Sequence, residues 1–265
     1  MNILVIGCGN MGLTYAQSIQ KNFDKANISA LENNKERVNV LKETTSFNVF
    51  TQPEECVANA NMILLAIKPQ GSKAVFESIK PFVKKSQVIL SIMAGVTIDT
   101  IKQSLECPKV VRAMPNLPAQ VGFGVTGYTA AKAVTGIELE YIAQILGATG
   151  TAVEVKNENE IDAITALSGS GPAYVFYFME AMMKQAETFG FNESQAKDIV
   201  VNTFLGTAEL FKNSETDAQT WMDKVTSKGG TTHAALTSFK NNNLNEKIKQ
   251  GVDEAFKRAK ELAKN

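Results

Sequence analysis

The sequence contains little of what metal sites, disulfide frameworks and nucleic-acid surfaces require. It has one histidine, one tryptophan and three cysteines in 265 residues, and lysine plus arginine equal aspartate plus glutamate at 27 each. The cysteines Cys8, Cys56 and Cys107 show no Cys-x-x-Cys spacing, so we expect no disulfides, no bound metal and a reducing, cytoplasmic environment. With no net charge and no dense basic cluster, we expect no nucleic-acid partner.

Long apolar runs are missing as well. The longest are short segments such as Met62–Ile67, far below the roughly 20 residues of a membrane-spanning helix. The first residues, Met1–Gly7, have no basic segment and run directly into glycines, which is not the pattern of a signal peptide. We therefore expect no membrane association.

The first part of the sequence alternates short apolar runs with helical patterns. This alternation predicts an α/β domain whose mainly parallel sheet is covered by helices on both faces. The predicted strands are Ile3–Ile6, Ile28–Leu31, Met62–Ile67, Val88–Ile92, Val110–Ala113, Gly124–Thr129 and Ala152–Glu154, and the predicted helices are Asn10–Lys21, Lys35–Thr44, Gly71–Phe82, Ile98–Leu105 and Ala131–Leu146.

The pattern changes at the polar run Lys156–Glu160, after which strand signals vanish. We therefore expect a domain boundary here, with a dinucleotide-binding domain at 1–157 and an all-helical domain at 158–265. The helices predicted beyond it are Tyr174–Phe189, Glu193–Phe211, Ala218–Lys224, Thr231–Lys240 and Leu244–Ala263.

A glycine-rich loop follows the first predicted strand and opens the first predicted helix. Its sequence, Gly7-Cys8-Gly9-Asn10-Met11-Gly12, fits the G-x-G-x-x-G pattern in the context that a dinucleotide site requires. The first glycine allows the tight turn, the second admits the pyrophosphate, and the third lets helix and strand pack closely. We predict that Ile6 and this whole loop bind a nicotinamide dinucleotide.

The end of the second predicted strand bears on which dinucleotide binds. Glu32 lies twenty positions after Gly12, where a carboxylate would accept from a ribose 2′-OH and favour NAD. The residues that follow it include Asn33, Lys35 and Arg37, which could instead donate to a 2′-phosphate. NADH, NADPH and dual use all remain open from these residues.

Two further loops follow predicted strands, at the edge of the sheet where ligands bind in α/β proteins. The loop Ala66-Ile67-Lys68-Pro69 places Lys68 near the expected cofactor, and Pro69 requires extended geometry at Lys68. The segment Ser91–Gly95 contains small residues, among them Ala94, that would admit a nicotinamide ring. We include Ala66 to Pro69 and Ala94 among the predicted cofactor contacts.

A second glycine loop lies near the other end of the sequence, at Val225–Thr232. It combines two glycines with serine and threonine hydroxyls just before a predicted helix. Such a loop can direct backbone N–H groups and hydroxyls toward one anion. Together with the dinucleotide loop, it predicts an enzyme that holds a small acid beside its cofactor.

Two other segments carry polar residues whose role the sequence leaves open. Leu167–Tyr174 is rich in glycine and serine and precedes a long helix, which suits close packing first and polar contact second. Arg112–Pro118 is stiffened by two prolines. Either Arg112 or Asn116 locks this loop or touches a ligand.

Taken in order, these segments resemble pyrroline-5-carboxylate reductase. The resemblance is carried by Gly7–Gly12, Ala66–Pro69, Arg112–Pro118, Asp162–Tyr174 and Val225–Lys240, and it covers almost the whole chain. The loop at Gly229-Gly230-Thr231-Thr232, with Ala235, Leu236 and Phe239 beyond it, is similar to the most specific signature of that family.

The resemblance implies a Rossmann domain followed by a helical domain that forms an interlocked homodimer, or a decamer built of dimers. It implies reduction of 1-pyrroline-5-carboxylate to L-proline by NADPH or NADH, with an active site built from two subunits. The substrate carboxylate would lie at Ser227, Gly229, Gly230, Thr231 and Thr232. Glu215 would face the ring nitrogen and favour its cation. The chemistry of the reduction leaves two sources for the proton, solvent or the Thr232 hydroxyl acting as a relay.

Three residues depart from the family pattern. Lys228 stands where proline is common, and Glu32 replaces a short polar residue common in members that prefer NADPH. His233, the only histidine, lies where an apolar residue is frequent. We do not assign it a catalytic role, because the reaction does not require a histidine.

Other functions remain open at the level of the sequence. A 3-hydroxyacid dehydrogenase would need a lysine shortly after the Leu167–Tyr174 segment, and the first lysine there is Lys184. A reductase of another cyclic imino acid would differ only in pocket shape. A dinucleotide-sensing regulatory module would explain Gly7–Gly12 but not Gly229–Thr232.

Overall fold

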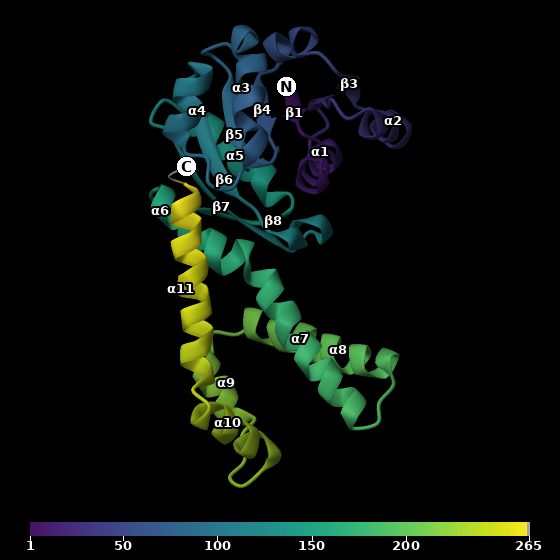
Figure 1. Cartoon of the computed structure of the whole chain (residues 1–265), viewed down its shortest axis with the longest axis vertical. Helices are drawn as coiled ribbons and strands as arrows, with labels where there is room; N and C mark the ends of the chain where they lie inside the picture. Colours follow the sequence, from purple (N-terminus) through teal and green to yellow (C-terminus); the bar gives the residue numbers. More distant parts are fainter. Residues whose placement is uncertain (264–265) are drawn as a thin grey trace. The chain divides into compact units, whose positions relative to one another are not determined.

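The computed structural model describes residues 1–263, which form two compact units. Unit 1 comprises residues 1–170 together with the last turns of the chain from Ala255, and unit 2 comprises Gly171–Glu254. Figure 1 labels the elements of both units.

Unit 1 contains an eight-stranded sheet with the order β3-β2-β1-β4-β5-β6-β7-β8. All neighbouring strands are parallel except β6 and β7, which are antiparallel. The sheet therefore confirms the predicted mainly parallel, doubly wound fold. The strands are β1 Asn2–Ile6, β2 Asn27–Leu31, β3 Asn48–Phe50, β4 Met62–Leu65, β5 Val88–Ser91, β6 Val110–Met114, β7 Gly124–Ala130 and β8 Gly150–Glu154.

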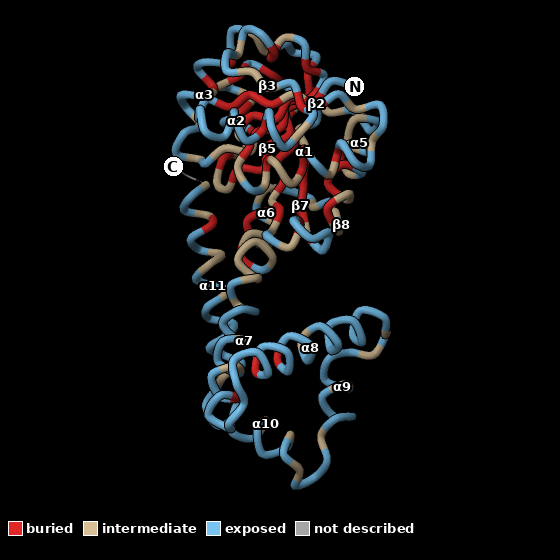
Figure 2. The backbone as a smooth tube through the Cα atoms, turned by 90° about the vertical axis from the view of Figure 1, so that its right-hand side faces the viewer, coloured by how far each residue is buried: buried red, intermediate tan, exposed pale blue. Residues whose placement is uncertain are grey.

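Helices cover both faces of this sheet, because successive side chains of each central strand point to opposite faces. In β1, Ile3 and Val5 join a core with helices α1, α2 and α5, whereas Leu4 and Ile6 join a second core with α3 and α4. Figure 2 shows buried residues concentrated along the strands. The helices of unit 1 are α1 Asn10–Asn22, α2 Lys35–Thr44, α3 Ser72–Ile79, α4 Ile98–Leu105, α5 Gly136–Gly147 and α6 Glu158–Ile164.

Helix α6 and the turn after it pack with unit 1, although a boundary was expected between residues 157 and 158. The Arg112 guanidinium, 1% exposed, donates to Asp162 at 2.8 Å and to Glu158 at 3.1 Å. Glu158 also accepts from the Ile98 N–H at 2.9 Å. These contacts tie α6 to β6 and α4, so the compact units divide after Ser170.

Unit 2 is entirely helical over its described residues. Side chains cap two of its helices: α8 has a capping box formed by Asn192 and Gln195, and Asp217 caps α9. Among the hydrophobic residues of the described unit, only Ala186, Ala196 and Val200 are buried. The helices are α7 Gly171–Thr188, α8 Glu193–Lys212, α9 Ala218–Lys224, α10 Thr231–Asn241 and α11 Leu244–Leu262, whose last turns belong to unit 1.

Candidate active site

The loop Gly7–Gly12 leaves the carboxyl end of β1 and enters α1. Strand β1 lies between β2 and β4, so the chain connections diverge in opposite directions at this point. In open α/β sheets, ligands bind at such a switch point, beyond the carboxyl ends of the strands. The structure thus places the predicted cofactor loop at the edge of the sheet where this class of fold binds ligands.

Close contacts explain why glycine is needed at two positions of this loop. Gly7 has a φ of +88°, and a Cβ there would lie 2.6 Å from Ile67 Cγ2 and 3.0 Å from the Ala66 carbonyl oxygen. A Cβ on Gly12 would overlap the Gly7 carbonyl oxygen. The first turn of α1 therefore packs directly on the loop and on the end of β4.

The N-terminus of α1 is free of any side-chain cap. Its N-cap is Gly9, which offers no side-chain acceptor, so the first N–H groups of the helix are open to a ligand. By contrast, Asn34 caps α2 and Thr97 caps α4 through their side chains. An uncapped N-terminus facing a glycine loop fits a dinucleotide pyrophosphate.

The two other predicted cofactor loops follow β4 and β5, the next strands along the same edge. Ala66 donates its N–H to the Ile6 carbonyl at 2.9 Å, and Ile67 lies against Gly7. Lys68 has the extended φ of −69° and ψ of 139° expected before Pro69. Ala94, half-buried, lies in the loop after β5. The loop residues Ala66 to Pro69 and Ala94 are thus brought to one edge with Gly7–Gly12.

Glu32 is oriented toward the glycine loop. Its carboxylate accepts from the N–H groups of Cys8 at 3.2 Å, Asn33 at 3.0 Å and Asn34 at 3.0 Å, and the residue is 7% exposed. Burial, reinforced by the Glu32 charge, raises the pKa of the Cys8 thiol to about 12. Cys8 therefore remains a neutral thiol inside the loop.

The second glycine loop lies in unit 2, between α9 and α10. Gly229 has a φ of +74°, Gly230 donates its N–H to the Ser227 carbonyl at 3.0 Å, and a Cβ on Gly230 would overlap Ser227 Oγ. Gly230 is also the N-cap of α10, again without a side-chain cap. The Ser227 hydroxyl and the open N–H groups of Thr231 and Thr232 are therefore adjacent, as an anion site requires.

Comparison with known proteins matches the two parts of the chain to two family models, and the second begins at residue 158, before the division between the compact units. Residues 158–262 match the family model for pyrroline-5-carboxylate reductase dimerisation, and residues 2–95 match that for NADP oxidoreductase, coenzyme F420-dependent. The pyrroline-5-carboxylate reductase of Pseudomonas aeruginosa is 35% identical over 263 residues, which are 98% of this chain and 96% of that protein. The chain belongs to the pyrroline-5-carboxylate reductase family.

Solved structures of this family share the fold throughout. The pyrroline-5-carboxylate reductase of Coxiella burnetii aligns with a TM-score of 0.91 and 33% identity, covering 100% of this chain and 99% of that one. The enzyme of Plasmodium falciparum, whose structure contains bound NADP, aligns with a TM-score of 0.88 and 28% identity, covering 99% and 98%. The reductase fold and the oxidoreductase class predicted from the sequence are thereby confirmed.

Some residues singled out in the sequence lie apart from these two loops. Glu215 is exposed in the turn between α8 and α9, and among the described residues it makes no hydrogen bond or ion pair with the Ser227–Thr232 loop. By contrast, Lys228 lies inside the second glycine loop and His233 directly follows it, and both residues are exposed. Arg112 locks α6 rather than touching a ligand, as its two buried ion pairs show.

From the sequence, Asn116 was expected either to lock its loop or to touch a ligand, and in the structure its side chain locks the loop. Its amide donates to Ser168 Oγ at 3.0 Å and accepts from the Val125 N–H at 2.8 Å. Ser168 lies in a π-helical turn, Thr165–Gly169, closed by the Ser170 N–H donating to the Thr165 carbonyl at 2.9 Å. The Asn116–Ser168 bond therefore holds this turn beside the loop that follows β6.

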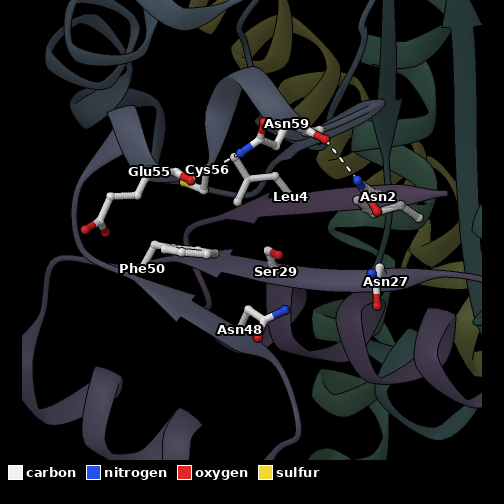
Figure 3. Close-up of a pocket in the computed structure, with 11 residues that line it drawn as sticks. Asn2, Leu4, Asn27, Ser29, Asn48, Phe50, Glu55, Cys56 and Asn59 are labelled. Carbon is white, nitrogen blue, oxygen red and sulfur yellow. Dashed lines mark hydrogen bonds between the residues drawn. The ribbon is translucent and has the colours of Figure 1, made fainter.

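One pocket of unit 1 lies away from the cofactor loop, whereas the apolar pocket of unit 2 includes Val225 at the start of the second loop. Figure 3 shows a pocket of about 150 Å³ lined by Asn2, Asn27 and Asn48, which begin β1, β2 and β3. It opens at the amino ends of the strands, opposite the cofactor edge. Residues 1–263 bring together no cluster of ligands for a metal ion, and no helix within them has the length and hydrophobicity to cross a membrane.

Proposed function

We propose that this member of the family reduces 1-pyrroline-5-carboxylate to L-proline with NADPH or NADH. The observation that carries the proposal is the pair of glycine loops, each ending at an uncapped helix N-terminus. One loop suits a pyrophosphate and the other suits a small carboxylate. The match to the reductase family over nearly the full chain supports the same reaction.

The residues of unit 1 fit a nicotinamide dinucleotide. Ile6, Gly7 through Gly12 and the loop Ala66 to Pro69 would hold its pyrophosphate side, and Ala94 would border the nicotinamide. Gly9 has no neighbour closer than 3.4 Å to the position of a Cβ, so its surface is open to a ligand. When bound, the cofactor supplies the hydride that reduces the C=N bond.

The residues of unit 2 would bind and orient the imino acid. The Ser227 hydroxyl and the N–H groups of Gly229, Thr231 and Thr232 would neutralise its carboxylate, with Gly230 forming the wall of the site, and Lys228 would add a positive charge nearby. The Thr232 hydroxyl would then donate to, or relay a proton to, the ring nitrogen. Glu215 would stabilise the protonated imine electrostatically.

We also propose that the chain works as a homodimer through unit 2, with a decamer of dimers as the larger assembly. Its helices expose large apolar side chains, including Tyr177 at 73% and Leu205 at 61%. An apolar groove of about 630 Å³ runs between α7, α8 and α9, lined in part by Phe204 and Trp221. Monomers rarely expose so much apolar surface.

The three free cysteines of the chain suit a cytoplasmic location.

Oxidation of NADPH and of NADH by the purified protein with synthetic 1-pyrroline-5-carboxylate tests the reaction. We expect turnover with the five-membered imine and weaker turnover with its six-membered homologue. Protein that binds NAD(P)H but turns over neither imine would contradict the proposal. Higher turnover of the six-membered ring would instead indicate a reductase of another cyclic imino acid.

The role of Thr232 can be tested separately. We expect Thr232→Ala to lower kcat/KM for the imine by about a hundredfold, since a positioned proton donor typically contributes that much. Thr237→Ala, an exposed threonine of the same helix, is the matched control and should change little. An unchanged kcat/KM in Thr232→Ala would exclude the proposed role.

A further inference from the structure

The carboxylate of Glu32 is held by the backbone of its own loop. Its two oxygens accept three N–H groups, from Cys8, Asn33 and Asn34. A carboxylate has about four lone-pair sites, so most of its capacity is used inside the protein. With 7% of the residue exposed, little of it is available to a ribose 2′-OH.

This arrangement fixes the turn between β2 and α2. The N–H groups of Asn33 and Asn34 are both directed to Glu32, and the Asn34 side chain in turn accepts from the Arg37 N–H at 3.0 Å. Glu32 thus links the glycine loop, through Cys8, to the first turn of α2. Its negative charge is also partly offset by three N–H dipoles.

The side chain of Arg37 lies over the glycine loop. Its Nη1 atom is 3.4 Å from the position that a Cβ of Gly9 would occupy. Arg37 is exposed, and within residues 1–263 its guanidinium has no ion-pair partner. Arg37 therefore presents a free guanidinium beside the open glycine loop, while the Glu32 carboxylate in the adjacent turn is directed inward. This arrangement suits a phosphate rather than a hydroxyl.

We propose that this chain selects NADPH, that Arg37 is the specificity-determining residue that pairs with the 2′-phosphate, and that Glu32 is a positioning residue that holds the turn rather than a ribose ligand. This inference rests on the proposed nicotinamide-dependent function, but it concerns cofactor binding alone. It opposes the simplest interpretation of an acidic residue at the end of β2, which is a preference for NAD.

Direct binding of NADPH and NADH, measured by fluorescence titration without the imine, tests the proposal. The wild type should bind NADPH more tightly, and this preference should fall as salt increases, because an exposed ion pair is screened. Arg37→Met should weaken NADPH binding about tenfold or more, as loss of a charged hydrogen bond does, with NADH affected less than about threefold and the salt dependence of the preference lost. Lys42→Met, an exposed cation in the last turn of the same helix, is the matched control and should change neither affinity.

Glu32→Gln separates the two roles by the sign of its effect. If Glu32 positions the turn, the variant binds NADPH more weakly and gains no preference for it. If Glu32 were the ribose ligand, the variant would bind NADPH more tightly and NADH more weakly, and our assignment would be wrong.

Three other results would also overturn the inference: tighter binding of NADH by the wild type, equal loss of both cofactors in Arg37→Met, or equal effects of Arg37→Met and Lys42→Met. Because no imine is present, failure of the reductase reaction would leave these results interpretable.

Discussion

The glycine loops of the two units begin helices in the same way but are supported differently. In unit 1, the loop is enclosed by buried strands, and Glu32 and Ile67 contact it directly. In unit 2, the loop at Ser227–Thr232 is largely exposed, and few hydrophobic residues of its unit are buried. The loop in unit 1 is therefore supported within a single chain, whereas the loop in unit 2 receives little support from its own unit, which fits the proposed dimer.

The largest effect should come from the buried ion pairs of unit 1. Arg112→Met leaves Asp162 without its cation in a buried site, and we expect the free energy of unfolding to fall by about 3 kcal/mol. Lys184→Met in unit 2 breaks only the exposed pair with Glu180, which should cost at most about 0.5 kcal/mol. Urea unfolding measures the free energy of unfolding of both variants. Equal losses of stability would show that the ion pairs of Arg112 stabilise unit 1 no more than the exposed pair stabilises unit 2.

Gly12→Ala tests how tightly the cofactor loop is packed. The new Cβ meets backbone, the Gly7 carbonyl, so the loop must move; we expect a loss of about 1–3 kcal/mol of stability and failure to bind NADPH. Gly147→Ala is the control, because a Cβ at this helical glycine meets nothing within 4 Å. Thermal unfolding and cofactor titration read out both variants. Normal cofactor affinity in Gly12→Ala would refute the tight packing of this loop.

Gly230→Ala should have a smaller and more selective effect. Its Cβ meets Ser227 Oγ, the end of a side chain that can rotate, so the fold should be little affected. The displaced hydroxyl should raise KM for the imine by about tenfold, as the loss of a hydrogen bond to a charged group does, with NADPH affinity unchanged. Steady-state kinetics compare it with Gly251→Ala, where a Cβ has no close neighbour. Weakened cofactor binding in Gly230→Ala would show that the two loops are not independent.

The smallest effect is expected at Cys8. Because burial and Glu32 raise the pKa of this thiol to about 12, the reactive thiolate is scarce below that pH. Iodoacetamide at pH 8 should therefore leave NADPH binding of the folded protein intact, while all three cysteines react after denaturation. Rapid loss of binding at pH 8 would mean that the cofactor loop opens far more readily than its packing indicates.

Much of the fold was predictable because its boundaries are marked by local chemistry. The bounds of α2, α4 and α9 were predicted exactly, since Asn34, Thr97 and Asp217 each cap the first turn. Helix α5 was expected from Ala131 but begins at Gly136, because the Thr135–Glu138 capping box sets its start. Strand β3, only three residues long, has too few positions to show a periodicity.

The orientation of charged side chains was the harder part. The sequence predicted that Glu32 lies at the cofactor loop. It did not predict that the Glu32 carboxylate accepts N–H groups from Cys8 and the following turn, because the residue types do not show which backbone N–H groups face a side chain. Arg112 was left between two roles for a similar reason, since its partners Glu158 and Asp162 are about fifty positions away. Ion pairs between residues this far apart in the sequence can be identified only when the fold is known.

The contact of Gly95 with the end of α11 bears on how the protein is made. A Cβ on Gly95 would lie 2.8 Å from the Leu262 carbonyl oxygen, so the loop after β5 is covered by residues translated after the whole of unit 2. On the ribosome, the cofactor domain would emerge with this edge uncovered and be completed only when the last turns of α11 dock. A tag fused directly after these turns would be placed beside the edge at which the cofactor is expected to bind, so affinity tags belong at the amino end.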